Sequence, residues 1–346
     1  MKDNGIPNFF KMTRCLFKTM LVIFGSIPHI ACTSSYKEDN GKITFAGKEI
    51  TDKNFIVLSD EFGKDSTTAY YKNIAFENVD VNSFEALDAN YAKDKNKAYY
   101  CDEYREGQNY YLTKRQTILE VALAIPSSFV SMGEGYAKDG NHAFFNGKVF
   151  PVKDIATFKV LNSNFCKDDI QAYLDSKPIA GSDGKSFELL DEFFAKDKNH
   201  IYFRESVGPQ KQRVTILPCD PTSFRLLEYP YSKDTATVFY EGKLIAGADA
   251  ATFELFKDKE TSQVEFNYAK DKASVFIDDK KINGAEVNSF KILDLGYGAD
   301  LKHVFYKHTR VKDASVVTFK TYEHGYGNED AEDANNKYLK GEKMPR

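Results

Sequence analysis

Aspartate and histidine recur three residues apart, a spacing that could bring two polar side chains to one site. The pairs are Asp139 with His142, Asp197 with His200, and Asp300 with His303. Such a pair on a turn could bind a metal ion or exchange protons. Other copies of the aspartate are followed at the same position by lysine, glutamine, threonine or serine. We therefore interpret this position as an exposed polar slot and predict no metal-binding residues.

The same aspartates open short stretches that resemble the start of a calcium-binding loop. Asp94-Lys-Asn96 and Asp139-Gly-Asn141 place oxygen-bearing side chains two residues apart. A calcium loop needs several more oxygen ligands and a closing acidic residue. Here lysine flanks the aspartate in seven of ten copies, which opposes cation binding. The pattern favours a carboxylate that accepts backbone N–H bonds and caps a turn, with no cofactor.

Other signs of catalysis are weak. We find no Gly-rich phosphate loop, no Gly-x-Ser-x-Gly and no His-Glu-x-x-His. A net charge of −4 argues against nucleic acid as the main partner. Cys101, Cys166 and Cys219 show no metal-ligand spacing, so we expect buried free thiols, with one disulfide as the alternative. The sequence predicts no enzyme and no catalytic residues; a hydrolase built from insertion loops is the remote alternative.

The aspartate belongs to a tandem repeat that accounts for the 21 tyrosines and 28 phenylalanines. An aromatic ring precedes the aspartate by three residues in nine of ten copies, and another usually follows it by five. A phenylalanine stands ten residues upstream in seven copies, and the basic period is 29 residues. The ten aspartates are Asp39, Asp65, Asp94, Asp139, Asp168, Asp197, Asp234, Asp271, Asp300 and Asp333.

The residue types within one period predict its local structure. The residues after each aspartate form a turn, and Val238-Phe-Tyr240 is typical of a strand. Glu241-Gly242 predicts a tight hairpin turn to a returning strand. The residues before each phenylalanine, such as 220–223, predict a single capped helical turn. The stretch from that phenylalanine to the next ring predicts a third strand.

These repeats define the expected fold. We predict an all-β chain with single helical turns, in which ~29-residue β-meanders stack as a solenoid-like array, since one unit cannot bury its aromatic face alone. A propeller-like closed ring is the alternative. The string Tyr91-Ala-Lys-Asp-Lys-Asn-Lys-Ala-Tyr-Tyr100 resembles the signature of the DKNYY family, over residues 36–344. The resemblance implies a bacterial protein exported to the cell envelope, and it transfers no site residues.

The first 31 residues resemble an export signal, with basic residues before the short apolar stretch 20–31. Ala31-Cys32 matches a lipoprotein signal, although His29 stands where leucine is usual. We expect a signal peptide over 1–31, a lipidated Cys32 with a tether over 32–35, and the repeat array over 36–346. Membrane attachment would follow from the lipid. A cleaved signal of a periplasmic or secreted protein, an uncleaved anchor, and a start at Met12 remain open.

Phe253 and Phe319 precede their aspartates by 18 and 14 residues, which implies insertions, and longer insertions break the period at 101–127 and 204–217. Variable loops on a regular scaffold tend to carry recognition, and tyrosine and arginine favour interfaces. Tyr104, Arg105, Tyr110 and Tyr111 are therefore candidate partner-binding residues. The alternative is that the insertion adds only a longer hairpin or a short helix. We expect a lipid-anchored envelope scaffold that binds a protein or glycan; the alternative is a structural component without a discrete ligand.

Overall fold

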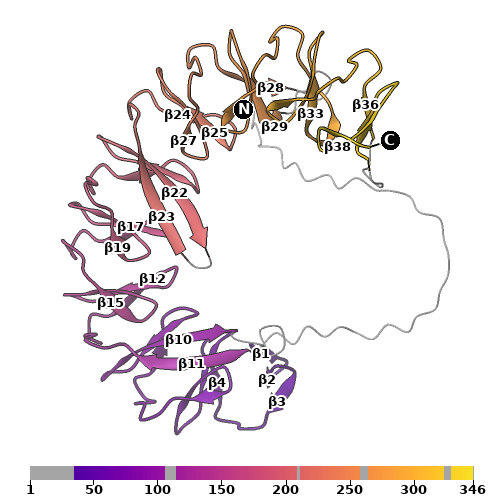
Figure 1. Ribbon diagram of the computed structural model, residues 1–346. Helices are drawn as coiled ribbons and strands as arrows, with labels where there is room; N and C mark the ends of the chain where they lie inside the picture. The colour runs from indigo at the N-terminus through magenta and orange to yellow at the C-terminus, as the bar shows by residue number, and fades with distance from the viewer. Residues whose placement is uncertain (1–34, 106–113, 209–210, 258–263, 323–328, 346) are drawn as a thin grey trace, which may run out of the picture.

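The computed structural model describes residues 35–105, 114–208, 211–257, 264–322 and 329–345. Over these residues the chain forms ten antiparallel sheets in sequence order, one of three strands and nine of four. Figure 1 shows them following one another along an open arc. This confirms the all-β, solenoid-like array of tandem repeats, and the open arc is not the closed ring of the alternative.

We number the repeats 1 to 10 by their sheets. Repeats 1 to 5 comprise β1 (Tyr36–Asp39), β2 (Lys42–Phe45), β3 (Lys48–Ile50); β4 (Ile56–Val57), β5 (Phe62–Lys64), β6 (Ala69–Tyr71), β7 (Ile74–Ala75); β8 (Glu85–Ala86), β9 (Tyr91–Lys93), β10 (Ala98–Tyr104), β11 (Arg115–Glu120); β12 (Val130–Gly133), β13 (Tyr136–Lys138), β14 (Ala143–Phe145), β15 (Lys148–Phe150); β16 (Lys159–Val160), β17 (Phe165–Lys167), β18 (Ala172–Leu174) and β19 (Lys177–Pro178).

Repeats 6 to 10 comprise β20 (Glu188–Leu189), β21 (Phe194–Lys196), β22 (Ile201–Gly208), β23 (Lys211–Leu217); β24 (Arg225–Leu226), β25 (Tyr231–Lys233), β26 (Val238–Tyr240), β27 (Lys243–Leu244); β28 (Glu254–Lys257), β29 (Val264–Lys270), β30 (Val275–Ile277), β31 (Lys280–Lys281); β32 (Lys291–Ile292), β33 (Tyr297–Ala299), β34 (Val304–Tyr306), β35 (Thr309–Arg310); β36 (Lys320–Thr321), β37 (Ala331–Glu332), β38 (Lys337–Leu339) and β39 (Glu342–Lys343).

The four strands of a repeat form a meander, one more strand than the sequence predicts. The stretch from the phenylalanine to the ring was expected to be a single strand, but a turn divides it in two. In repeat 3 this turn is closed by Asp88, whose Oδ1 accepts the backbone N–H groups of Asn90 and Tyr91 at 2.8 and 2.7 Å. A short polar side chain that bonds the backbone ahead of it favours a turn over a continuous strand.

The segment before each phenylalanine is a hydrogen-bonded turn. In repeat 3 the N–H of Ser83 donates to the carbonyl of Asp80 at 3.2 Å and to its Oδ1 at 3.0 Å. The capping residue is therefore as predicted, but the segment makes a turn and not a helical turn. Within the described residues the assigned helix is the 3₁₀ segment η2 (Asp294–Gly296). None of these residues builds a helix with the length and apolar character to cross a bilayer.

Adjacent sheets share their core. One cluster joins Phe165 and Leu174 of repeat 5 to Phe187 and Tyr202 of repeat 6, and all four are buried. Each fully buried aromatic or aliphatic side chain stabilises the fold by about 1.5–3 kcal/mol. Each cluster among the described residues draws on two adjacent sheets, so repeats 2 to 10 complete their cores with a neighbour.

Two kinds of side-chain contact between repeats run forward along the chain. The tyrosine before the turn places its hydroxyl on the next repeat, as when Tyr91 donates to the carbonyl of Gly135 at 2.9 Å. The lysine before the aspartate does the same, since Lys93 Nζ reaches the carbonyl of Phe129 at 3.0 Å. Further examples are Tyr36 to Lys72, Tyr136 to Asn164, Tyr231 to Asn267, Lys64 to Phe84, Lys167 to Phe187 and Lys233 to Ala250.

Repeat 10 has neither forward donor. The position of the tyrosine holds Asp330, and the position of the lysine holds Glu332. Asp330 instead receives the hydroxyl of Tyr297 from repeat 9 at 2.7 Å. The tenth repeat therefore accepts the contact of its neighbour and carries no equivalent group to pass on.

Candidate functional site

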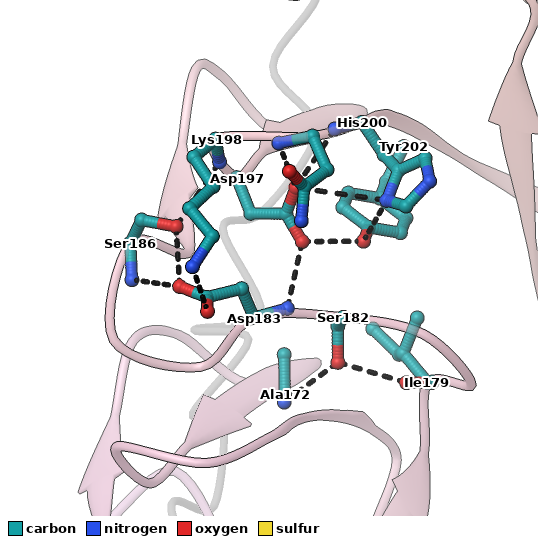
Figure 2. A network of polar contacts seen from close by, with 10 residues as sticks. Ala172, Ile179, Ser182, Asp183, Ser186, Asp197, Lys198, His200 and Tyr202 are labelled. Carbon is teal, nitrogen blue, oxygen red and sulfur yellow. Dashed lines mark hydrogen bonds and ion pairs between the residues drawn. The ribbon is translucent and has the colours of Figure 1, made fainter.

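The repeated aspartate is a buried structural node. Figure 2 shows the copy at Asp197, which is 3% exposed. Its Oδ1 accepts the backbone N–H groups of Asn199 and His200 at 2.7 and 2.8 Å. Its Oδ2 accepts the N–H of Asp183 at 2.8 Å and the hydroxyl of Tyr202 at 2.6 Å. One carboxylate thus holds the tight turn, the preceding turn and a core ring in place, as the turn-capping prediction requires.

The charge of Asp197 is stabilised by these donors. Burial alone would raise the pKa of its carboxyl, but the N–H of Asp183, the hydroxyl of Tyr202 and the two turn N–H groups lower it below the ordinary value. Both oxygens already accept two hydrogen bonds each. The carboxylate is therefore committed to its own turn and is poorly placed to bind a cation.

The three histidines lie at the surface edge of this node. Nδ1 of His142, His200 and His303 stands 3.3, 3.7 and 3.8 Å from Oδ1 of its aspartate. Among the described residues, no three histidine, cysteine or carboxylate side chains gather as a metal site would require. Each histidine lies beside an aspartate whose carboxylate already accepts three backbone N–H bonds.

The three cysteines of the array are free thiols, two of them buried and Cys219 half-buried. Burial raises the pKa of Cys219 to about 12 and shifts those of Cys101 and Cys166 in the same direction. A thiol with a raised pKa is a poor nucleophile at neutral pH. These residues act as small apolar side chains in the core.

A small hollow of about 310 Å³ lies on repeat 4, beside the hairpin turn. Asn141, His142, Ala143 and the apolar run Val149-Phe-Pro-Val152 line it. It contains a single titratable side chain, so an acid/base pair cannot be built from its lining.

The first insertion extends the third and fourth strands of repeat 3 into a long hairpin. Registered pairs run from Tyr99 with Glu120 out to Tyr104 with Arg115. This is the longer hairpin of the alternative interpretation. The short helix that the same alternative allowed over 118–124 is not formed, because β11 and a turn occupy those residues. Figure 1 shows the hairpin on the inner side of the arc.

Ion pairs hold this hairpin against the preceding repeat. Glu103 lies 2.9 Å from Lys72 of repeat 2 and 2.5 Å from Lys114, and it accepts a hydrogen bond from Gln116 at 3.2 Å. Burial would raise the pKa of Glu103, but Lys114, Lys72 and Gln116 together lower it to about 2. The hairpin is thus fixed in position by a charged network.

The four candidate partner-binding residues fall at the outer end of this hairpin. Tyr104 is 38% exposed, and Arg105 is exposed beside it. Tyr110 and Tyr111 lie outside the described residues. The structure therefore places two of the four at the outer end of a protruding hairpin.

The second insertion builds an equivalent hairpin in repeat 6. Strands β22 and β23 pair from Ile201 with Leu217 to Gly208 with Lys211. Figure 1 shows this hairpin pointing into the arc. The sequence flagged 204–217 as an insertion, but we proposed no binding residues in it. The sequence contained a signal that the two insertions are alike, since Arg115-Gln116 and Lys211-Gln212 each begin the returning strand with a basic residue followed by glutamine.

The root of the second hairpin carries an aromatic and arginine cluster that sequence reasoning missed. The rings of Phe193 and Tyr229 stack at 4.7 Å with 25° between their planes. Arg204 lies over Phe193 at 5.5 Å and donates to the carbonyl of Glu192 at 3.0 and 3.1 Å. Tyr229 is 42% exposed. The sequence did contain a signal for this cluster. Phe193 occupies a turn position at which repeat 3 has Asn90, a residue that favours turns.

Comparison with known proteins gives one result. The model of the DKNYY family matches residues 8–103, 104–177, 165–217, 210–280 and 268–344, which together span nearly the whole chain. No curated protein and no solved structure matches it.

Proposed function

The chain belongs to the DKNYY family, and from this premise we propose that it is a non-enzymatic scaffold of the bacterial cell envelope that binds a protein or glycan partner. The observation that carries the proposal is the pair of long hairpins, β10–β11 and β22–β23, on an array whose other repeats end in short turns. Both hairpins lie on the inner side of the arc (Figure 1).

The outer halves of the hairpins add little to the core. Side chains past Cys101 and Arg204 are half-buried or exposed, including Tyr104, Ser206 and Val207. The sheets of the other repeats close with a two-residue turn, so the array folds without such extensions. Rigid surface extensions that folding does not need support a role in recognition.

The exposed ring of Tyr229 favours a binding scaffold over a purely structural component. A structural component would have a uniformly polar surface, whereas Tyr229 presents an aromatic face beside the second hairpin. Tyrosine and arginine are enriched where protein interfaces concentrate binding energy. The structural component without a discrete ligand remains the alternative function.

Two variants test the proposal directly. In one, residues 101–118 and 204–214 are each replaced by the Asn-Gly turn that repeat 4 uses; in the matched control, Asn-Gly replaces the ordinary turn at Lys307-His308. Residues 33–346 of each, with the unaltered chain, are used to capture proteins and glycans from envelope fractions. We expect a ligand retained by the unaltered chain and the control, and lost from the shortened variant. Identical captures by all three would favour the structural component.

Membrane attachment is a separate part of the proposal. The signal over 1–31 and Cys32 lie outside the described residues, and the support is the Ala31-Cys32 pattern after a basic and apolar stretch. Metabolic labelling with a palmitate analogue should mark the full chain and not Cys32→Ala. An unlabelled full chain would remove the lipid anchor and leave a periplasmic or secreted protein.

A further inference from the structure

Strand β23 leaves a long sheet edge open. In the described sheets the last strand has two residues in six repeats, namely β7, β19, β27, β31, β35 and β39, and three in β3 and β15. The exceptions are β11 with six residues and β23 with seven, and each forms the outer edge of its sheet. A long edge strand presents a row of backbone groups that no neighbouring strand has paired.

The register identifies which groups point outward. The backbone bonds from Arg204 to Phe193 and from Asp197 to His200 show that even-numbered residues of β22 face β21. Odd-numbered residues of β22 therefore face β23, and they pair with odd-numbered residues there, as Phe203 does with Thr215. It follows from antiparallel geometry that Gln212, Val214 and Ile216 turn their N–H and C=O groups away from β22.

Strand β18 of repeat 5 lies near β23, but no described residue pairs with the outward backbone groups of this edge. Neither the backbone bonds nor the side-chain bonds of the described chain include a partner for the N–H or C=O groups of Gln212, Val214 and Ile216. The strand is nevertheless held in place. Val214 packs on the shared core of repeats 5 and 6, and Gln212 Nε2 donates to Asn164 at 2.7 Å. The edge is thus preorganised, which lowers the ordering cost of binding.

We propose that the edge of β23 binds an extended peptide segment of a partner protein, with acidic side chains, as an additional strand. The proposal rests on the proposed function and names its partner class. Outward N–H and C=O groups that recur at every second residue, about 7 Å apart, match another extended backbone. A sugar chain has no such alternation of donors and acceptors.

Charge selects an acidic partner and argues against a second copy of the chain. The described hairpin is net basic on a chain of net charge −4, with Arg204, Lys211 and Arg213 against Glu205. Arg204 is buried beside Glu192 and Arg213 lies 2.6 Å from Glu205, so Lys211 supplies most of the positive charge that an incoming strand would meet. Two copies paired along β23 would bring Lys211 and Arg213 toward the same residues of the other copy. Like charges across a strand pair are destabilising, whereas glutamates opposite them are favourable.

The test uses the full chain and a nine-residue synthetic peptide in which glutamate alternates with valine or threonine. Hydrogen exchange is read residue by residue. In the free chain the amides of Arg213 and Thr215 should be protected, and those of Gln212, Val214 and Ile216 should exchange fast. The peptide should slow exchange at these three amides and leave Arg213 and Thr215 unchanged. A peptide N-methylated at every residue should not bind.

A variant pair locates the site. Val214→Pro removes an outward N–H without breaking a bond to β22, and we expect about tenfold weaker peptide binding, the loss of roughly one hydrogen bond and its geometry. Ile118→Pro is the matched control at the equivalent position of β11, and it should bind the peptide like the unaltered chain. Thermal unfolding of both variants checks that the fold is kept.

The outcomes separate this inference from the function on which it rests. Unchanged exchange at Gln212, Val214 and Ile216, or full peptide affinity in Val214→Pro, would overturn the edge site. If envelope capture still depended on the hairpins, the scaffold function would stand without it. Protection of the three amides by an envelope glycan in place of the peptide would likewise overturn the extended peptide as the occupant.

Discussion

The hydroxyl of Tyr202 donates a 2.6 Å hydrogen bond to Oδ2 of Asp197, five residues earlier in the chain. The same relationship recurs across the array, with distances of 2.7 to 3.0 Å. In other repeats the ring is phenylalanine, as at Phe144 and Phe239, and the carboxylate there has no tyrosine hydroxyl to accept. The copies are Tyr70 with Asp65, Tyr99 with Asp94, Tyr173 with Asp168, and Tyr338 with Asp333.

Two substitutions of Tyr202 should distinguish the contribution of its hydrogen bond to stability from the contribution of its buried ring. Tyr202→Phe copies the phenylalanine repeats and should lower the free energy of unfolding by about 1 kcal/mol. Tyr202→Ala removes a fully buried ring shared by repeats 5 and 6 and should cost about 3–5 kcal/mol. Limited proteolysis should show opening of both repeats in Tyr202→Ala. A variant that unfolds like the unaltered chain and resists proteolysis would contradict the shared core.

The repeated aspartates predict acid sensitivity. Burial would raise the pKa of these carboxyls, but backbone N–H groups and, at three of them, a tyrosine hydroxyl hold it below its ordinary value for Asp139, Asp168, Asp197, Asp234, Asp300 and Asp333. A carboxyl whose folded pKa is depressed adds stability above its unfolded pKa of about 3.9, and this is lost as pH falls through the folded value.

We therefore expect the fold to keep its stability from neutral pH down to about pH 4 and to lose it steeply below. Circular dichroism during denaturant unfolding at several pH values measures this. Asp197→Asn provides the comparison, because the free-energy gap between it and the unaltered chain should shrink as pH falls. A gap that stayed constant with pH would show that the charge of Asp197 is unimportant.

Alanine substitutions at two glycines distinguish the cost of backbone strain from the cost of a steric clash. Gly242 and Gly247 have φ of 69° and 76°, where side chains other than glycine are strained. A Cβ on Gly242 would lie 2.4 Å from Cδ1 of Phe203 in the preceding repeat, whereas a Cβ on Gly247 meets nothing within 4 Å. Gly247→Ala should cost about 1 kcal/mol, and Gly242→Ala roughly 2–4 kcal/mol. Equal costs by chemical denaturation would remove the close contact between repeats as a constraint.

The forward lysine contact can be tested with an internal control. Lys233 is buried, and its Nζ bonds the carbonyls of Ala250 and Phe253 in the next repeat. Lys196 occupies the same position in repeat 6 but pairs with Glu188 at the surface of its own sheet. Lys233→Met should cost about 1–3 kcal/mol because it leaves two carbonyls without their donor.

Lys196→Met should change the free energy of unfolding by less than about 0.5 kcal/mol, as for an exposed ion pair. Hydrogen exchange at the turn before Phe253 should accelerate in Lys233→Met alone. Comparable losses in both variants would mean that the lysine stabilises its own sheet and not the junction with the next.

Local patterns predicted the repeat well because each marker reports a local physical demand. The turn after the aspartate, the tight turn at Glu241-Gly242 and the buried rings all follow from residue type and spacing. The extra strand was missed because two-residue strands such as β24 are too short to show an alternating pattern. They exist only through pairing with the strand beside them.

The contacts between repeats could not be predicted from the sequence for a different reason. The role of Lys233 depends on the distance to a carbonyl 17 residues away, which no local pattern encodes. The cluster of Phe193, Arg204 and Tyr229 likewise forms only when two repeats stack. Of the candidate site, the sequence located the insertions, but it could not show that both extend the same pair of strands.

Asp330 and Glu332 affect where a further repeat could be added to the array without loss of the forward contacts. An internal copy such as repeat 3 or repeat 7 carries both a receiving surface and the tyrosine and lysine that engage its successor, so duplication of such a copy would preserve both contacts at the new junction. A copy placed after repeat 10 would face the carboxylates of Asp330 and Glu332 where repeats 3 and 7 present a hydroxyl and an ammonium group. Gene duplication of such copies can therefore add repeats upstream of repeat 10 without loss of these contacts.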